Sequence, residues 1–311
     1  MTPEIPPAGT PAGGNRGAGY ALAVLAAMVS AVAWITAKPV LDYLDPLSFS
    51  VAQFALASVF SFAWLVATRR SGKLLAVTPG QWTFLTVISL LSLSAVYTMY
   101  IALSSIPATA ASLLSRLEIL VTVFLGMALL GDRITRREFY GALVMFVGVV
   151  LIRYQAPPHF TAGFWMMVLS ATLFGLTEVM VKSRVHAIPP DVFAFSRNFI
   201  AFAFCFVGAG WRVFMKETPF WHGLIDWDNT MRGLPLVVLT ALAGPFLART
   251  IGLYALKRLE ISRVVIIRQF EPLCVAVYSA ILLHTLPSRR EWTGGLLILA
   301  GALLLVHWRR G

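Results

Sequence analysis

The chain has 311 residues, of which 58% are hydrophobic and 13% are charged, and its mean hydropathy is +0.78. Soluble domains are near half apolar and a quarter charged, so this balance excludes an ordinary soluble protein and indicates an integral membrane protein. The net charge of +11 does not indicate nucleic-acid binding, because the basic residues stand in short clusters between apolar runs. Membrane proteins place their basic residues in this way.

The first residues, 1–18, are rich in proline and glycine and show no hydrophobic periodicity, so we expect a disordered cytoplasmic tail. The apolar run that follows is long and is succeeded at once by others, which favours a first transmembrane helix over a signal peptide. About 20 mostly apolar residues cross a hydrocarbon core. By that measure the expected spans are ten, at residues 20–37, 47–67, 81–103, 108–130, 138–153, 162–183, 191–213, 234–256, 261–284 and 291–308.

The basic residues between these spans predict the orientation. Lysine and arginine are about twice as frequent on the side that holds both termini, and this side is then the cytoplasmic one. The two cysteines, Cys205 and Cys274, lie inside apolar runs, and we interpret them as small packing residues rather than a disulfide.

An internal repeat organises the chain. Residues 102–141 align with 255–294 and place Glu118 in register with Glu271. A second match aligns 46–53 with 190–197, so that Trp34 falls on Glu178 and Gln53 on Arg197. Because each half holds an odd number of spans, five, the halves must be inverted relative to each other in the membrane. Inverted repeats are typical of carriers that work by alternating access, with the substrate site near the midplane.

The two halves end in similar segments, LLGDRITRREFYGALVMFVGVVLI and LLHTLPSRREWTGGLLILAGALLL. With these motifs the chain resembles the two EamA domains of the drug/metabolite transporter superfamily. The resemblance covers about residues 20–308 and implies an all-α membrane fold of ten helices, arranged as two inverted five-helix repeats at 19–154 and 161–308. It also implies a multi-pass protein of the bacterial inner membrane that exports amino acids, other small metabolites or drugs.

Ionisable residues at bilayer depth are costly and are by default candidates for a functional site. Glu118 and Glu271 each lie near the middle of an expected span. We expect them to contact the cargo, and they could exchange a proton for it; the alternative is that each is paired permanently with a buried arginine. Arg268 and Glu271 are three residues apart and could share a helix face. Arg116 and Glu118 are two apart, and in a regular helix they point in nearly opposite directions.

Three more sets of residues complete the expected site. Arg197 and Arg249 lie in their spans at a depth similar to that of Glu178, either as a vestibule for an anionic or zwitterionic cargo or as an internal salt bridge. Six aromatic residues within the spans could stack on the cargo or pack between helices: Trp34, Tyr97, Tyr100, Phe174, Tyr254 and Tyr278. The glycines at 141, 148, 294 and 301 are expected to let helices pack closely. The predicted substrate-binding residues are Glu118, Glu271, Arg197, Arg116, Arg268, Tyr97 and Trp34.

The sequence contains no paired acidic motif, Walker loop, nucleophile elbow or Cys/His metal spacing. We therefore expect no enzymatic activity, no cofactor, no metal and no nucleic-acid partner. The prediction is a monomeric secondary transporter that exports a small organic metabolite such as an amino acid or related carboxylate. The alternatives are a flippase of a lipid-linked or amphiphilic compound and a proton-coupled exporter of drugs or cations.

Overall fold

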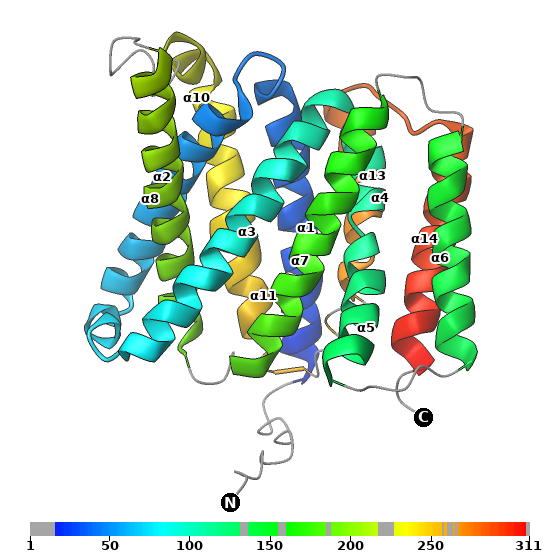
Figure 1. The fold of residues 1–311 in the computed structure, drawn as a ribbon, viewed down its shortest axis with the longest axis horizontal. Helices are drawn as coiled ribbons and strands as arrows, with labels where there is room; N and C mark the ends of the chain where they lie inside the picture. The colour runs from blue at the N-terminus through cyan, green and yellow to red at the C-terminus, as the bar shows by residue number, and fades with distance from the viewer. Residues whose placement is uncertain are drawn as a thin grey trace, which may run out of the picture.

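The computed structural model describes residues 16–130, 136–154, 160–184, 188–216, 227–256, 258, 259, 264 and 267–308. Throughout these ranges the regular structure is helical (Figure 1). The helices are α1 (Arg16–Val40), α2 (Pro46–Ala67), η1 (Ser71–Leu74), α3 (Pro79–Ser105), α4 (Ala108–Leu114), α5 (Leu117–Leu130), α6 (Arg136–Tyr154), α7 (Phe160–Arg184), α8 (Pro190–Lys216), α10 (Trp227–Ala241), η3 (Leu242–Ala248), α11 (Arg249–Leu256), α13 (Glu271–Leu282) and α14 (Arg289–Trp308). The expected all-α membrane fold of two repeats is confirmed.

The ends of several helices follow directly from the sequence. Asp45 caps α2, because its side chain accepts hydrogen bonds from the backbone N–H groups of Leu47 and Ser48, and Pro46 occupies the first helical position. Thr78 and Gln81 form a reciprocal capping box at the start of α3. Among the described residues, six helical segments are long and apolar enough to cross a membrane, one of which joins α10, η3 and α11.

Two helix boundaries differ from the expected spans. α1 begins at Arg16, so the end of the segment that we expected to be a disordered tail is helical; residues 1–15 lie outside the described part of the chain. α10 begins at Trp227, seven residues before the expected start of that span. The apolar runs mark only the apolar part of each helix, and these two helices begin in the more polar sequence that precedes it.

Two of the expected spans are interrupted rather than continuous. Ser115 and Arg116 form a turn between α4 and α5, and Gln269 and Phe270 form a turn before α13. These turns occupy matching places in the two halves, since Arg116 aligns with Gln269 in the repeat register. Glu118 and Glu271 therefore lie in the first turns of α5 and α13, where the helix dipole favours a carboxylate. Broken helices of this kind commonly build the substrate sites of transporters.

A third irregularity occurs in one half only. The helix from Trp227 to Leu256 changes to π-helical hydrogen bonding over η3, which contains Pro245. Proline has no N–H to donate, so it cannot continue a regular α-helical ladder. Short π-helical segments are frequent at functional sites.

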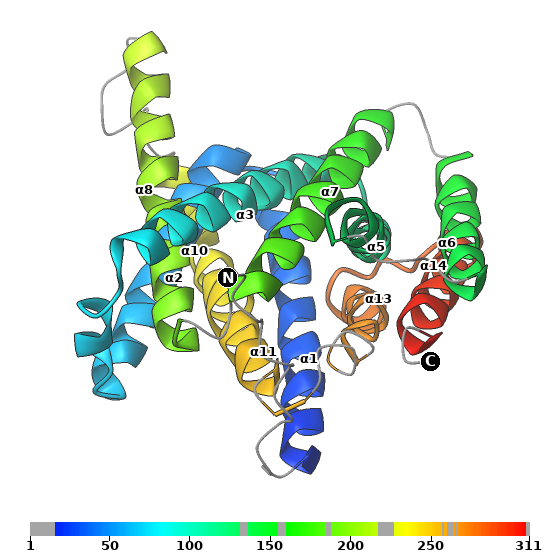
Figure 2. The ribbon, with the colours of Figure 1, turned by 60° about the horizontal axis from the view of Figure 1, so that its bottom comes forward.

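The packing of the helices follows the inverted repeat (Figures 1 and 2). α1 packs against α13, and its counterpart α7 packs against α5; α2 packs against its own counterpart α8, and α6 against α14. The N-terminal end of α1 and the C-terminal end of α14 lie at the same end of the molecule (Figure 1). Each of these pairs joins a helix of the first half to a helix of the second half, so the two halves share an extensive interface.

Glycines define the contact between α6 and α14. A Cβ added to Gly148 would lie 2.5 Å from the carbonyl oxygen of Gly294, and one added to Gly301 would lie 2.5 Å from that of Gly141. In the repeat register Gly141 corresponds to Gly294 and Gly148 to Gly301. The two contacts are therefore exchanged by a two-fold operation, as inverted repeats require. The predicted role of these glycines in close packing is confirmed.

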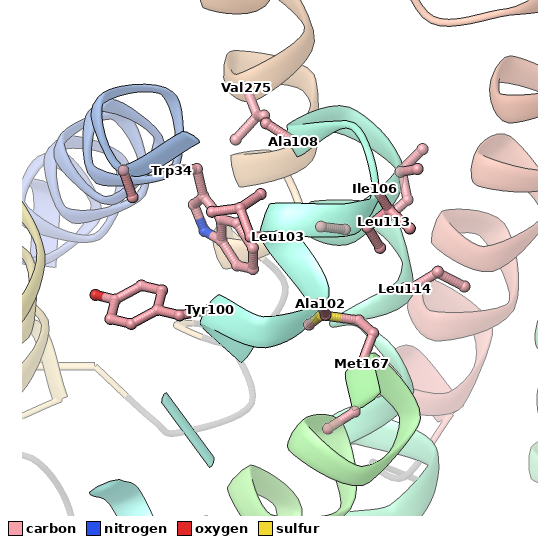
Figure 3. Packing of buried hydrophobic residues seen from close by; sticks show 14 of the residues in the cluster. Trp34, Tyr100, Ala102, Leu103, Ile106, Ala108, Leu113, Leu114, Met167 and Val275 are labelled. Atoms are coloured by element: carbon pink, nitrogen blue, oxygen red, sulfur yellow. The ribbon is translucent and has the colours of Figure 1, made fainter. Parts of the chain in front are cut away.

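A hydrophobic cluster surrounds the start of α4 and fixes the interrupted helix in place. Ala108, Leu113 and Leu114 of α4 are buried together with Leu103 of α3 and Val275 of α13 (Figure 3). Met167 from α7 belongs to the same cluster. The first half of the broken helix is thus packed by elements of both repeats, which positions the turn at Ser115 and Arg116.

Candidate functional site

A cavity of about 210 Å³ lies between the two repeats. Its walls come from α1, α2, α3 and the α4–α5 turn of the first half, and from α7, α8, the η3–α11 segment and the start of α13 in the second half. Both helix interruptions and the π-helical segment border it. The irregular backbone among the described residues therefore borders the cavity, where freed backbone N–H and C=O groups can contact a ligand or water.

Six of the seven predicted binding residues line this cavity: Trp34, Arg116, Glu118, Arg197, Arg268 and Glu271. Tyr97 does not belong to the lining; Tyr100, about one helical turn further along α3, does. Tyr97 instead lies near Asp45 and Arg212, whose charges act on its hydroxyl. The prediction for Tyr97 was wrong because hydropathy indicates how deep a residue lies in a span but not which side of α3 faces the cavity. That orientation depends on the helices that pack against α3.

Arg116 and Glu271 join the two repeats by a buried salt bridge. Nη2 of Arg116 lies 3.3 Å from Oε2 of Glu271, and the side chains are 3% exposed each. Ser30 and Trp34 donate hydrogen bonds of 2.6 Å and 2.9 Å to Oε1 of the same carboxylate. Arg116 also donates to the backbone carbonyl of Arg268. Glu271 pairs with this arginine from the other repeat, and not with Arg268 of its own segment.

The interruption of the helix changes the geometry expected for Arg116 and Glu118. In a regular helix these two side chains would point apart, but both line the cavity. The turn at Ser115 and Arg116 separates α4 from α5, so the two residues no longer share one helical register. We expected that the two side chains could face one cavity only if the helix were distorted, and the turn between α4 and α5 is that distortion.

Glu178 of α7 pairs with Arg249 of α11. Nη1 of Arg249 donates to Oε1 of Glu178 at 3.0 Å, and both residues line the cavity. Of the two alternatives for this group, the internal salt bridge is present, and it lies in the wall of the cavity. Arg268 lies within electrostatic range of Glu118, Glu271 and Glu178.

Arg197 differs from the other arginines of the cavity. It is 7% exposed, and its Nε makes no hydrogen bond. Its Nη2 donates to Oδ1 of Asn198 at 3.2 Å and to the carbonyl of Pro245 at 3.4 Å, both of which are uncharged. Among the described residues no carboxylate forms a salt bridge with it. Glu178 acts on Arg197 electrostatically but forms its salt bridge with Arg249, and a buried charge without a salt bridge of its own is expensive.

The structure adds residues that the sequence did not single out for the site. Gln53 and Ser92 line the cavity, and the buried hydroxyl of Ser92 has no hydrogen-bond partner. The register of Gln53 with Arg197 was the available signal for Gln53. Nothing in the sequence distinguishes Ser92 from the other serines of α3. Among the described residues no group of His, Cys, Asp or Glu side chains is arranged to hold a metal ion.

Two polar clusters lie outside the cavity, at opposite ends of the α2–α8 pair. In the first, Asp191 at the start of α8 accepts hydrogen bonds from Arg70, Tyr254 and Trp64. In the second, Asp45 at the start of α2 accepts a hydrogen bond of 2.8 Å from Arg212 near the end of α8. Each cluster thus fastens the beginning of one helix to the end of its repeat-related partner.

The carboxyl of Asp45 shows how such a cluster acts on ionisation. Partial burial by itself raises the pKa of Asp45, but hydrogen bonds from Ser48 and the charge of Arg212 outweigh it, so the pKa lies below its usual value. The ionised form is therefore the one that the folded protein stabilises.

Comparison with known proteins agrees with this architecture. The model of the EamA-like transporter family matches the chain twice, over residues 17–154 and 161–307. An uncharacterized transporter of Synechocystis sp. is 25% identical over 248 residues, which cover 75% of this chain and 67% of that protein. An uncharacterized transporter of Archaeoglobus fulgidus is 25% identical over 297 residues, which cover 92% of this chain and 96% of that protein.

A solved crystal structure shares the fold, with a TM-score of 0.64 at 19% sequence identity, and the match covers 96% of this chain and 100% of the other. The duplicated family match, the membrane-spanning helices and the cavity between two inverted repeats all describe one kind of molecule. The chain is a member of the EamA-like transporter family and an integral membrane transporter.

Proposed function

We propose that this protein is a secondary transporter of the bacterial inner membrane, with both termini in the cytoplasm, that exports a small organic metabolite bearing a carboxylate, such as an amino acid. The observation that carries the proposal is Arg197, a buried guanidinium in the cavity wall whose Nε makes no hydrogen bond and which forms no salt bridge among the described residues. A carboxylate on the cargo would supply the missing counter-charge and use the unsatisfied Nε.

The charge distribution in the cavity supports an anionic group rather than a simple cation. The described lining residues include the arginines at 116, 197, 249 and 268 and the glutamates at 118, 178 and 271. Two of the glutamates are already in salt bridges with arginines, Glu271 with Arg116 and Glu178 with Arg249. A cation entering this cavity would meet an excess of positive charge, and like charges at short range are costly.

The position of the cavity supports alternating access as the mechanism. Both repeats contribute to its walls, and the helix interruptions that border it are related by the inverted repeat. If one half rocks against the other, the same residues can face either side of the membrane in turn. The cargo would remain bound to Arg197 while the opening changes sides.

The test is release from proteoliposomes loaded with a mixture of bacterial metabolites, with the external medium followed by mass spectrometry. We expect selective release of carboxylate-bearing compounds, and Arg197→Gln should weaken apparent affinity at least about tenfold, because a hydrogen bond to a charged group is lost. Arg289→Gln, which removes an exposed charge at the start of α14 outside the cavity, is the matched control. Release that Arg197→Gln does not change would contradict the proposal, and movement of labelled lipids instead would favour a flippase.

A further inference from the structure

We propose that Gln53 is a second cargo-contacting residue, and that Gln53 and Arg197 together restrict the cargo to molecules with a single carboxylate. This inference rests on the proposed function and specifies the charge class that the site accepts. Gln53 on α2 and Arg197 on α8 occupy the same position of the two repeats. Both are buried, at 2% and 7% exposure, and both line the cavity.

The two side chains meet the same short stretch of backbone. Arg197 donates to the carbonyl of Pro245. A Cβ added to the preceding Gly244 would lie 3.9 Å from Nε2 of Gln53. The π-helical segment η3, which contains Gly244 and Pro245, therefore lies beside both residues. A cargo group that sits against this segment is within reach of donors from both repeats.

Neighbouring side chains fix the orientation of both donors. The hydroxyl of Tyr100 donates to Oε1 of Gln53, which leaves the amide N–H groups for another acceptor. No described residue accepts a hydrogen bond from Nε2 of Gln53. Asn198 accepts from Nη2 of Arg197 and itself donates to Ser61 and to the carbonyl of Pro245. Nε2 of Gln53 and Nε of Arg197 thus have no hydrogen-bond acceptor among the described residues, while the hydrogen bonds to Tyr100, Asn198 and Pro245 hold the two side chains in place.

The difference in charge between these two equivalent positions sets the specificity. Arg197 can neutralise one carboxylate, whereas Gln53 offers only neutral donors, which suit a carbonyl, a hydroxyl or the second oxygen of the same carboxylate. A second carboxylate on the cargo would be desolvated without a counter-charge, which is far more costly than leaving it in water. An arginine at position 53 would remove that penalty.

The experiment compares cargo pairs that differ only in an amide or an acid at one position: glutamine with glutamate, and succinamate with succinate. Proteoliposomes are loaded with equal amounts of each pair, and the initial release of both members is measured for the wild type, Gln53→Arg, and the double variant Gln53→Arg/Arg197→Gln. Gln81→Arg adds the same charge at the capping box of α3, outside the cavity, and serves as the control. The folded state of every variant is checked by thermal unfolding in detergent.

We expect the wild type to prefer the amide of each pair that it carries, and Gln53→Arg to shift the ratio of acid to amide upward by about tenfold, which is the effect of one hydrogen-bonded charge. The double variant exchanges the two residues between the repeats and keeps the net charge, so the preference for the amide should return. Gln81→Arg should leave the ratio unchanged. A structural role of Gln53 would change the rate for both members together and leave their ratio constant.

The outcomes separate this inference from the function on which it rests. Release of an amide member that Arg197→Gln weakens, with a ratio that Gln53→Arg does not alter, would overturn the role of Gln53 and leave the transporter of carboxylates intact. A wild type that releases acid and amide equally would also overturn it. Release of no member of either pair by the folded wild type would count against the proposed function and, with it, this assignment.

Discussion

At the scale of single residues, the cavity combines charges that are paired in salt bridges with the guanidinium of Arg197, whose Nε has no hydrogen-bond partner. Arg116 and Glu271 satisfy each other, and Ser30 and Trp34 complete the hydrogen bonding of the carboxylate. Glu271 therefore serves two purposes at once: it lines the cavity and it holds the repeats together. The two alternatives that we considered for the buried acids are not exclusive at this residue.

This salt bridge leads to a prediction about stability. Glu271→Gln keeps the shape of the side chain and an acceptor for Trp34, but it leaves Arg116 buried without its counter-charge. Removing one partner of a buried salt bridge typically costs about 3–5 kcal/mol, so we expect a clear fall in the midpoint of unfolding in detergent. In the double variant Arg116→Met/Glu271→Gln both charges are absent, and most of the loss should be recovered. Equal instability of the single and double variants would show that the pairing contributes little.

The cluster at the end of α2 predicts a dependence on pH. The pKa of Asp45 is lowered in the folded protein, because hydrogen bonds from Ser48 and the charge of Arg212 outweigh the effect of burial. Its contribution to stability is therefore fully present above the unfolded pKa, about 3.9, and is lost as the pH falls through the lower folded value. Asp45→Asn preserves the helix cap but not the charge. The difference in thermal midpoint between wild type and variant should be constant near neutral pH and shrink below about pH 4; a constant difference across that range would contradict this account.

At the scale of helices, the sequence predicted the position of the spans and their duplication. Membrane-spanning segments are recognisable by their hydropathy, and the duplication is visible as similarity between the two halves of the sequence. Of the interruptions at Ser115–Arg116 and Gln269–Phe270, the first was not predicted at all. Neither turn has a proline within it; the segments are as apolar as an unbroken helix, and the packing of neighbouring helices decides the outcome. Pro272, which follows the second turn, marks only one of the two sites.

The salt-bridge partners of the charged side chains could not be predicted from the sequence either. Arg116 and Glu271 are separated by 155 residues, and Arg249 and Glu178 by 71. Local spacing favoured Arg268 as the partner of Glu271, since residues three apart share a helix face. Contacts between repeats depend on tertiary structure that spacing along the chain does not report. The candidate site was therefore predicted as a set of residues but not as a set of pairs.

The α6–α14 contact gives a prediction at the same scale. A Cβ at Gly148 or Gly301 would lie 2.5 Å from a backbone carbonyl oxygen, so Gly148→Ala and Gly301→Ala force two helices apart. Such overpacking typically costs about 1–3 kcal/mol, and we expect lower thermal midpoints for both variants. Gly208→Ala in α8 is the matched control, because a Cβ there meets nothing within 4 Å and alanine favours the helix. Midpoints that fall as much for Gly208→Ala as for the α6–α14 variants would contradict this explanation.

At the scale of the whole molecule, alternating access requires the cavity to be reached from both sides of the membrane. Ala33 lines the cavity on α1 and is only partly buried. In a background without Cys205 and Cys274, we expect Ala33→Cys to react with a membrane-impermeant maleimide added to either side of oriented vesicles, and a carried cargo should slow the reaction. A cysteine in place of Ser104, on the exposed end of α3 outside the cavity, should react from one side only. Labelling of Ala33→Cys from a single side would contradict alternating access.

The π-helical segment around Pro245 distinguishes the two halves, because the matching part of α3 is a regular helix. If the two inverted halves were identical, a two-fold rotation would convert the inward-open conformation into the outward-open one, and their energies would then be equal. Every position at which the halves differ adds to the energy gap between these conformations and so to their populations at rest. Any preference of the empty carrier for one side of the membrane would accordingly arise from a few local departures from symmetry, of which η3 and the Gln53–Arg197 pair lie at the cavity itself.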